Sequence, residues 1–104
     1  MYEINPNEVT WEWIESDQLI CTTCAYIVHA HITPDGTAQA YSTVYDGHNT
    51  SGKVLFKMRS YNWTAVPFAF GLPIYASQGI YVTLSDAIDG VLIGYYKIPT
   101  PPSQ

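Results

Sequence analysis

Glycine and proline interrupt this chain so regularly that it has little room for long helices. There are seven of each among 104 residues, and the runs between them are rich in Tyr, Trp, Thr, Val and Ile, which favour strands. No run carries the apolar i, i+3, i+4, i+7 pattern of an amphipathic helix over three turns. The sequence therefore predicts an all-β protein.

Alternation of side chains indicates where the strands lie. Ile80, Val82 and Leu84, for example, share one face of a run whose other positions are Tyr, Thr and Ser, a period of two that is typical of a strand. Asp35-Gly36 is expected to close a hairpin, and Asp89-Gly90 to turn the chain into its last strand. About seven or eight strands are expected, at residues 10–15, 24–33, 37–45, 53–60, two short strands within 62–76, then 79–85 and 91–98.

The length of 104 residues predicts a single domain. Strands at this spacing are typical of an antiparallel β-sandwich or a barrel. We expect an acidic N-terminal segment with a short strand at residues 1–17, the sandwich at residues 18–98, and an extended Pro-rich tail at residues 99–104.

Charge and hydropathy exclude two classes of partner. Nine Asp and Glu against four Lys and Arg give a net charge of -5, which leaves no positive excess to neutralise nucleic-acid phosphates. The longest apolar stretch, residues 65–76, contains Pro67, Gly71 and Pro73 and is shorter than the roughly 20 residues of a membrane-spanning helix. The first residues show no secretory signal. Binding to nucleic acid and insertion into a membrane are therefore not expected.

Residues 47–54, with the sequence GHNTSGKV, match the phosphate-binding loop pattern G-x-x-x-x-G-K up to its last position. Val54 replaces the Ser or Thr whose hydroxyl binds magnesium, and a strand rather than a helix is expected to follow. We therefore predict a glycine-rich hairpin loop that does not bind ATP. The sequence also has no Gly-x-Ser-x-Gly elbow and no His-Glu-x-x-His run, so we do not expect an enzyme.

Two cysteines and two histidines lie close together in the sequence. Cys21 and Cys24 have the spacing of a redox pair or of half a zinc site, but redox pairs lie at helix starts and a strand is expected here. His29 and His31 should project from one face of a strand, as in the His-x-His of cupins, although the Glu of the cupin pattern is missing. We expect no metal and no other cofactor. A cupin-like metal site on the two histidines, with the cysteines as further candidate ligands, is an alternative.

The apolar content points to self-association. Both faces of residues 91–98 are apolar, and the chain has nine Tyr, three Trp and three Phe. A lone subunit would expose large apolar patches of the kind found at interaction sites. We therefore expect a permanent homo-oligomer. Candidate interface residues are Trp11, Trp13, Tyr81, Tyr95 and Tyr96.

Several segments resemble small β-sandwich proteins of tailed-phage virions. The resemblance covers residues 24–98, and the segments that carry it are residues 35–38 (DGTA), 44–54 (VYDGHNTSGKV), 70–74 (FGLPI), 79–82 (GIYV) and the pair Tyr95-Tyr96. It implies a jelly-roll-like subunit, commonly trimeric, that serves as a capsid decoration, a head fibre or a related virion component.

From these features we expect a non-enzymatic structural subunit, a homotrimer that docks to a phage capsid or tail component and is located in the virion. The alternative is a carbohydrate- or receptor-binding module that uses exposed aromatic rings as platforms, with Trp11, Trp13, Trp63 and the Tyr residues as candidates. The position of the indoles distinguishes the two functions. Buried indoles would disfavour sugar binding, and two coplanar indoles in an open groove would favour it.

Overall fold

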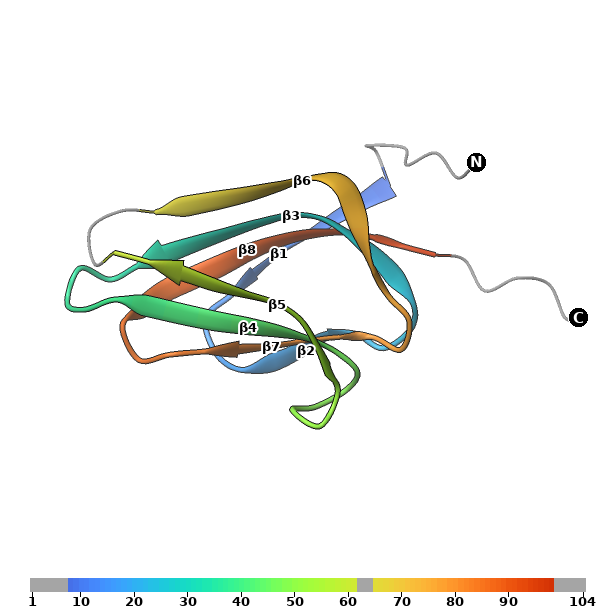
Figure 1. The fold of residues 1–104 in the computed structure, drawn as a ribbon, viewed down its shortest axis with the longest axis horizontal. Helices are drawn as coiled ribbons and strands as arrows, with labels where there is room; N and C mark the ends of the chain where they lie inside the picture. The colour runs from blue at the N-terminus through green and yellow to red at the C-terminus, as the bar shows by residue number, and fades with distance from the viewer. Residues whose placement is uncertain (1–7, 62–64, 99–104) are drawn as a thin grey trace, which may run out of the picture.

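A computed structural model describes residues 8–61 and 65–98 and places eight strands in two layers (Figure 1). No α-helix occurs in these two ranges. The strands are β1 (Val9–Ile14), β2 (Gln18–Cys21), β3 (Ala25–Pro34), β4 (Ala40–Asp46), β5 (Lys53–Ser60), β6 (Val66–Ala76), β7 (Ile80–Leu84) and β8 (Ile88–Lys97).

The strands form two antiparallel sheets, which confirms the predicted single-domain β-sandwich. Sheet A has the order β1-β8-β3-β6 and sheet B the order β2-β7-β4-β5. Only β4 and β5 are both consecutive in the chain and paired, and every other connection crosses from one sheet to the other. Two four-stranded sheets joined in this order make a jelly roll.

The core lies between the two sheets and is aliphatic. One alternating set of side chains from each sheet points inward and is removed from water, which is the main favourable term in folding. Tyr95 also points inward, and its hydroxyl donates a hydrogen bond of 3.0 Å to the carbonyl of Ile20, which links the two sheets. The largest fully buried side chains are Ile14, Ile27, Ile32, Val44, Met58, Ile80, Val82, Val91 and Ile93.

The hairpin predicted at Asp35-Gly36 is wrong, because β3 and β4 belong to different sheets. The turn itself is present: Gly36 has a φ of 92°, and the Asp35 carboxylate accepts a hydrogen bond of 2.9 Å from the N–H of Thr37. The N–H of Asp35 donates to the carbonyl of Ala87 in the loop between β7 and β8. The turn therefore carries the chain from sheet A to sheet B.

Three other details differ from the predicted strands. Asp89-Gly90 lies inside β8, where Gly90 pairs with Thr33, and the chain turns earlier, at residues 85–87. Residues 66–76 form one strand rather than two short ones. The short strand β2 was not predicted.

The two ends of the chain were expected to lie outside the sandwich. Residues 9–14 pair with β8, so the described part of the 1–17 segment belongs to the sandwich. The tail at 99–104 lies outside the described residues.

The glycine-rich loop at residues 47–52 joins β4 to β5, as predicted, and a strand follows it. At this end of the molecule the carboxylate of Asp46 accepts hydrogen bonds from the backbone of Ser77 and Gln78. Nε2 of His48 lies 3.0 Å from the carbonyl oxygen of Thr22 and 2.9 Å from that of Gln78. These contacts tie the loops before β3, β5 and β7 together.

Sheet A ends in β1 and β6, and sheet B ends in β2 and β5. Pro67 and Pro73 lie on the edge strand β6, where a proline can be accommodated although it has no N–H to donate to a neighbouring strand. Lys53, Lys57 and Arg59 lie on β5. Prolines and cations are residues that proteins commonly place on open sheet edges.

Candidate functional site

On the outer face of sheet A, strand pairing aligns three rows of residues across the four strands. Residues directly opposite one another on neighbouring strands share a face of the sheet. None of the residues in these rows is Lys, Arg, Asp or Glu. From β1 through β8 and β3 to β6, the rows are Val9–Tyr96–Tyr26–Tyr75, Trp11–Gly94–His29–Ala69 and Trp13–Leu92–His31–Pro67.

A β-bulge in β3 brings these rows onto one face. The register of β3 shifts between Ile27 and His29 against both β6 and β8. In a regular strand Tyr26 and His29 would point to opposite faces, because their separation of three residues is odd. The extra residue of the bulge restores the match. Tyr26, His29 and His31 therefore all belong to the uncharged face.

The two tryptophans of β1 lie against glycines of β8. A Cβ atom on Gly94 would come within 2.5 Å of the Trp11 ring, and one on Gly90 within 2.3 Å of the Trp13 ring. Trp11 nevertheless remains 53% exposed and Trp13 47% exposed. Nε1 of Trp13 donates a hydrogen bond of 2.7 Å to the carboxylate of Glu15. Two of the three candidate indoles therefore lie half-exposed on one open face of the molecule, and the third, Trp63, lies outside the described residues.

The histidines lie next to these indoles. The ring of His29 makes an edge contact with Trp11 at a centroid distance of 5.7 Å, and His31 follows 6.4 Å from His29. Nε2 of His31 is buried and has no hydrogen-bond partner among the described residues. The predicted projection of both histidines from one face is confirmed by their register.

The cysteines do not join the histidines in a cluster. Cys21 is buried, and its thiol lies 3.3 Å from the carbonyl oxygen of Thr23; Cys24 is half-buried, and both thiols are free. Within residues 8–61 and 65–98, no three His, Cys, Asp or Glu side chains gather where they could hold a metal ion. The alternative metal site is therefore not assembled from Cys21, Cys24, His29 and His31.

The five predicted interface residues lie in three different places. Trp11 and Trp13 are on the outer face of sheet A. Tyr81 is half-buried on the outer face of sheet B, where its ring lies 6.3 Å from that of Tyr45. Tyr96 is on the outer face of sheet A but only 5% exposed. The prediction for Tyr95 is wrong, because this side chain points into the core and is 7% exposed.

Two tyrosines of this face were not singled out from the sequence. The rings of Tyr26 and Tyr75 lie 5.4 Å apart on β3 and β6. Desolvation, and then the nearby Cys24 and Tyr26, raise the pKa of Tyr75. The two tyrosines are 49 positions apart in the sequence and meet only through strand pairing. Apolar alternation in residues 24–32 could have indicated Tyr26, but not its partner.

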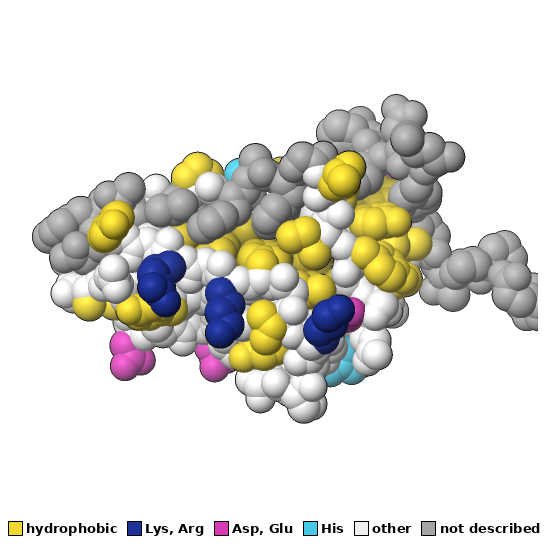
Figure 2. Space-filling model, in the orientation of Figure 1, with side chains coloured by type: hydrophobic (Ala, Val, Ile, Leu, Met, Phe, Trp, Pro, Cys, Tyr) yellow, Lys and Arg dark blue, Asp and Glu magenta, His cyan; other side chains and the backbone are white. Residues whose placement is uncertain are grey.

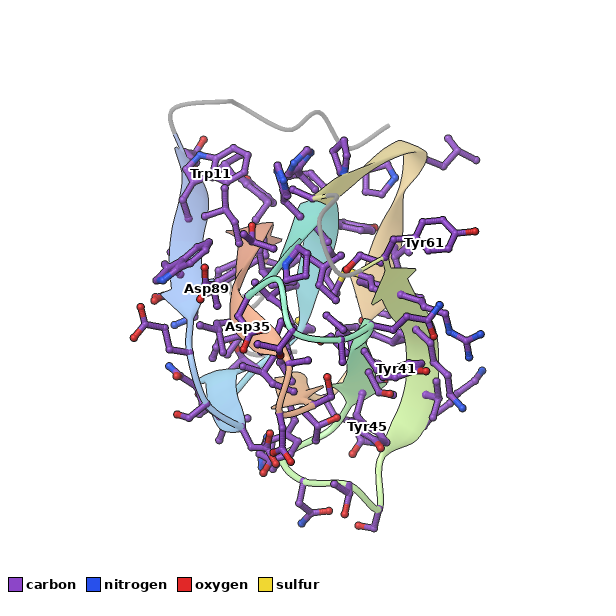
Figure 3. The ribbon with its side chains drawn as sticks, turned by 90° about the vertical axis from the view of Figure 1, so that its left-hand side faces the viewer. Trp11, Asp35, Tyr41, Tyr45, Tyr61 and Asp89 are labelled. Atoms are coloured by element: carbon purple, nitrogen blue, oxygen red, sulfur yellow. The ribbon has the colours of Figure 1, made fainter. Side chains whose placement is uncertain are left out.

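The opposite face of the sandwich has a different character. Figure 2 shows Lys and Arg side chains spaced along the side of the molecule where β5 lies. Arg59 is paired with Tyr41 across β4 and β5, and its guanidinium carbon lies 5.0 Å from the centre of the Tyr41 ring. Figure 3 separates Trp11 beside β1 from Tyr41, Tyr45 and Tyr61 on the other side. The molecule thus has one uncharged face and one basic face.

Comparison of the chain with known protein families, with characterised proteins and with solved structures finds no match. Within the part of the chain that the structure describes, no helix has the length and hydropathy needed to cross a membrane.

Proposed function

We propose that this protein is a non-enzymatic structural subunit that self-associates through the outer face of sheet A. One observation carries the proposal: three rows across four strands contain no charged residue and include the half-exposed indoles of Trp11 and Trp13. Contiguous apolar surface of this kind, rich in Trp and Tyr, is typical of protein interfaces. Burial of these rings between subunits supplies the free energy of association.

A second copy of the same chain is the partner that suits this face. The chain has a net charge of -5, so copies repel one another wherever their charges meet. The uncharged rows avoid that repulsion. Two acidic residues that follow the indoles are engaged within their own subunit: Glu15 accepts a hydrogen bond from Trp13, and Asp17 accepts one from the N–H of Leu84.

The jelly-roll strand order and the resemblance of residues 24–98 to tailed-phage proteins support a virion component as the setting. In this proposal the subunit is a homotrimer located in the virion, where it decorates a capsid or forms part of a fibre. A threefold ring uses two different surfaces of each copy. In the proposed ring the outer face of sheet A is one of these two surfaces, and it packs against the other surface of the neighbouring copy.

Sedimentation equilibrium of the purified chain tests the proposal. We expect a mass of about three times the 11.6 kDa of one chain. The double variant Trp11→Ser/Trp13→Ser should shift the mass toward a single chain. The matched control is Tyr41→Ser, which removes an exposed ring from the opposite face and should leave the assembly intact. A wild-type protein that stays monomeric at high concentration would contradict self-association.

The exposed indoles favour one second candidate function, a sugar-binding platform on the same face. Trp11 and Trp13 lie side by side on an open surface, each packed against a glycine, and the apolar face of a sugar ring can stack on such rings. If the wild-type protein is a monomer and binds a neutral glycan on an array, and the double variant loses that binding, the platform function replaces self-association.

A further inference from the structure

We propose that the basic face of sheet B binds a carboxylated saccharide at Arg59. Two cavities lie next to each other here and share this arginine. One, of about 310 Å³, is lined by Gln39, Arg59, Ser60 and Tyr61. The other, of about 370 Å³, includes Tyr41, Thr43, Lys57 and Arg59 in its lining. Volumes of this size are at the lower end of the range for small-molecule sites.

The guanidinium of Arg59 is held in place by its neighbours. It lies over the ring of Tyr41 at 5.0 Å, and the hydroxyl of Tyr41 donates a hydrogen bond of 2.9 Å to Oε1 of Gln39. Within the described residues, the contact found for the Arg59 guanidinium is therefore with the Tyr41 ring and not with a carboxylate. A pre-positioned guanidinium can accept a carboxylate in a two-pronged hydrogen bond.

Charge supports an anionic ligand. Lys53, Lys57 and Arg59 are three of the four Lys and Arg residues in a chain of net charge -5, and all three lie on β5. This concentration of positive charge attracts anions to one strand of an otherwise acidic protein. Three cations are too few for extended nucleic-acid binding, which needs many phosphate contacts. A single acidic group on a small ligand matches them better.

The remaining wall groups suit a sugar ring. Tyr61 is exposed at the first cavity and offers a ring face for the C–H groups of a saccharide. Gln39 in the first cavity and Thr43 in the second carry polar groups for hydroxyls. A ligand with an apolar ring face, several hydroxyls and one carboxylate therefore meets each kind of group that is present.

Calorimetric titration with 3′-sialyllactose and with lactose tests the carboxylate requirement. We expect 3′-sialyllactose to bind at least about tenfold more tightly than lactose, since a charge-assisted pair contributes roughly one to two factors of ten. Arg59→Gln should remove that preference, and Arg59→Lys should weaken it, because lysine lacks the planar fork. Lys97→Gln makes the same charge change on β8 and should leave binding unchanged. Equal binding of both sugars, or an unaffected Arg59→Gln variant, would overturn the proposal.

The site does not depend on self-association. The Trp11→Ser/Trp13→Ser variant should therefore retain 3′-sialyllactose binding. If that variant loses the sugar while Arg59→Gln keeps it, the saccharide binds sheet A and the Arg59 site is refuted.

Discussion

The indole of Trp13 lies directly over Gly90, so closely that a Cβ atom on that glycine would meet ring atom Cζ2 at 2.3 Å. Trp11 covers Gly94 in the same way. Both pairs join the edge strand β1 to its neighbour β8 on the outer face of sheet A. The glycines are therefore the space into which the tryptophans pack, and an aromatic ring over a strand glycine is a known way to support such a position.

Replacing Gly90 with Ala should destabilise the protein. The new methyl group cannot coexist with the indole in its present position, so the ring has to move, and overpacking of this kind costs about 1–3 kcal/mol. Urea unfolding measures the loss, and the fluorescence of Trp13 should change because its ring leaves the strand surface.

The same substitution in a Trp13→Ala background is the matched control. With the indole removed, Gly90→Ala should be neutral or should stabilise by up to about 1 kcal/mol, since Ala suits a strand better than Gly. An equal loss in both backgrounds would show that the ring is not the cause.

Gly79→Ala should be more damaging, and no side-chain deletion should relieve it. Gly79 has a φ of 151°, and a Cβ there would lie 2.6 Å from the carbonyl oxygen of Cys21 and 2.9 Å from Cδ2 of His48. The carbonyl of Cys21 belongs to the backbone and cannot move aside as a side chain can. We therefore expect the free energy of unfolding, measured in urea, to fall by more than about 2 kcal/mol. The loss should persist in a His48→Ala background; full relief there would contradict the role of the Cys21 carbonyl.

Asp46→Asn should change how stability depends on acid. Partial burial raises the pKa of Asp46, but hydrogen bonds from the N–H groups of Ser77 and Gln78 and from the Ser77 hydroxyl outweigh it and hold that pKa below its ordinary value of 3.8. A carboxylate with a lowered folded-state pKa stabilises the fold above its unfolded-state pKa, and the contribution is lost as pH falls through the folded-state value.

The wild type should therefore exceed Asp46→Asn in stability at neutral pH, by less than about 1 kcal/mol because the group is mostly solvated. The difference should shrink below about pH 4. Urea midpoints between pH 2 and 7 measure it. A gap that does not vary with pH would exclude the carboxylate charge as its source.

Tyr95→Phe tests the link between the two sheets. The variant loses the 3.0 Å hydrogen bond to the Ile20 carbonyl, which should cost about 1 kcal/mol. Burial, followed by Cys21 and Glu12, raises the pKa of Tyr95. A phenol with a raised folded-state pKa stabilises the fold below its unfolded-state pKa, and this contribution is lost as pH rises through the folded-state value. The difference between wild type and variant should thus diminish above about pH 10; a constant difference in alkaline urea titrations would contradict this.

Local features of the sequence predict much of the strand content. β5 and β7 alternate clearly, and the glycine-rich loop before β5 marks the only hairpin between consecutive paired strands in the described chain. β2 has four residues, too few to show a period. Asp35-Gly36 and Asp89-Gly90 have the same composition, yet one is a turn between sheets and the other lies within a strand. Gly90 is needed there to accommodate Trp13, a contact between residues 77 positions apart.

The candidate sites depend still more on pairing between distant strands. The sequence shows that His29 and His31 share a face, but not that the bulge in β3 adds Tyr26 to it. Both faces of β8 are apolar for a reason that composition does not reveal: the inner set fills the core, and the outer set lies beside the rings of β1. Tyr95 and Tyr96 illustrate this, since adjacent tyrosines point to opposite sides of the sheet.

The residues on β5 and β6 also affect whether a foreign strand can add to these two sheet edges. On the edge strand β6, Pro67 and Pro73 have no N–H to donate to an incoming strand. On the edge strand β5, the charged groups of Lys53, Lys57 and Arg59 would lose hydration if another strand paired there. Joining margin to margin, the first step toward a cross-β fibre, is thereby discouraged. These two margins are thereby guarded against runaway growth of the sheet.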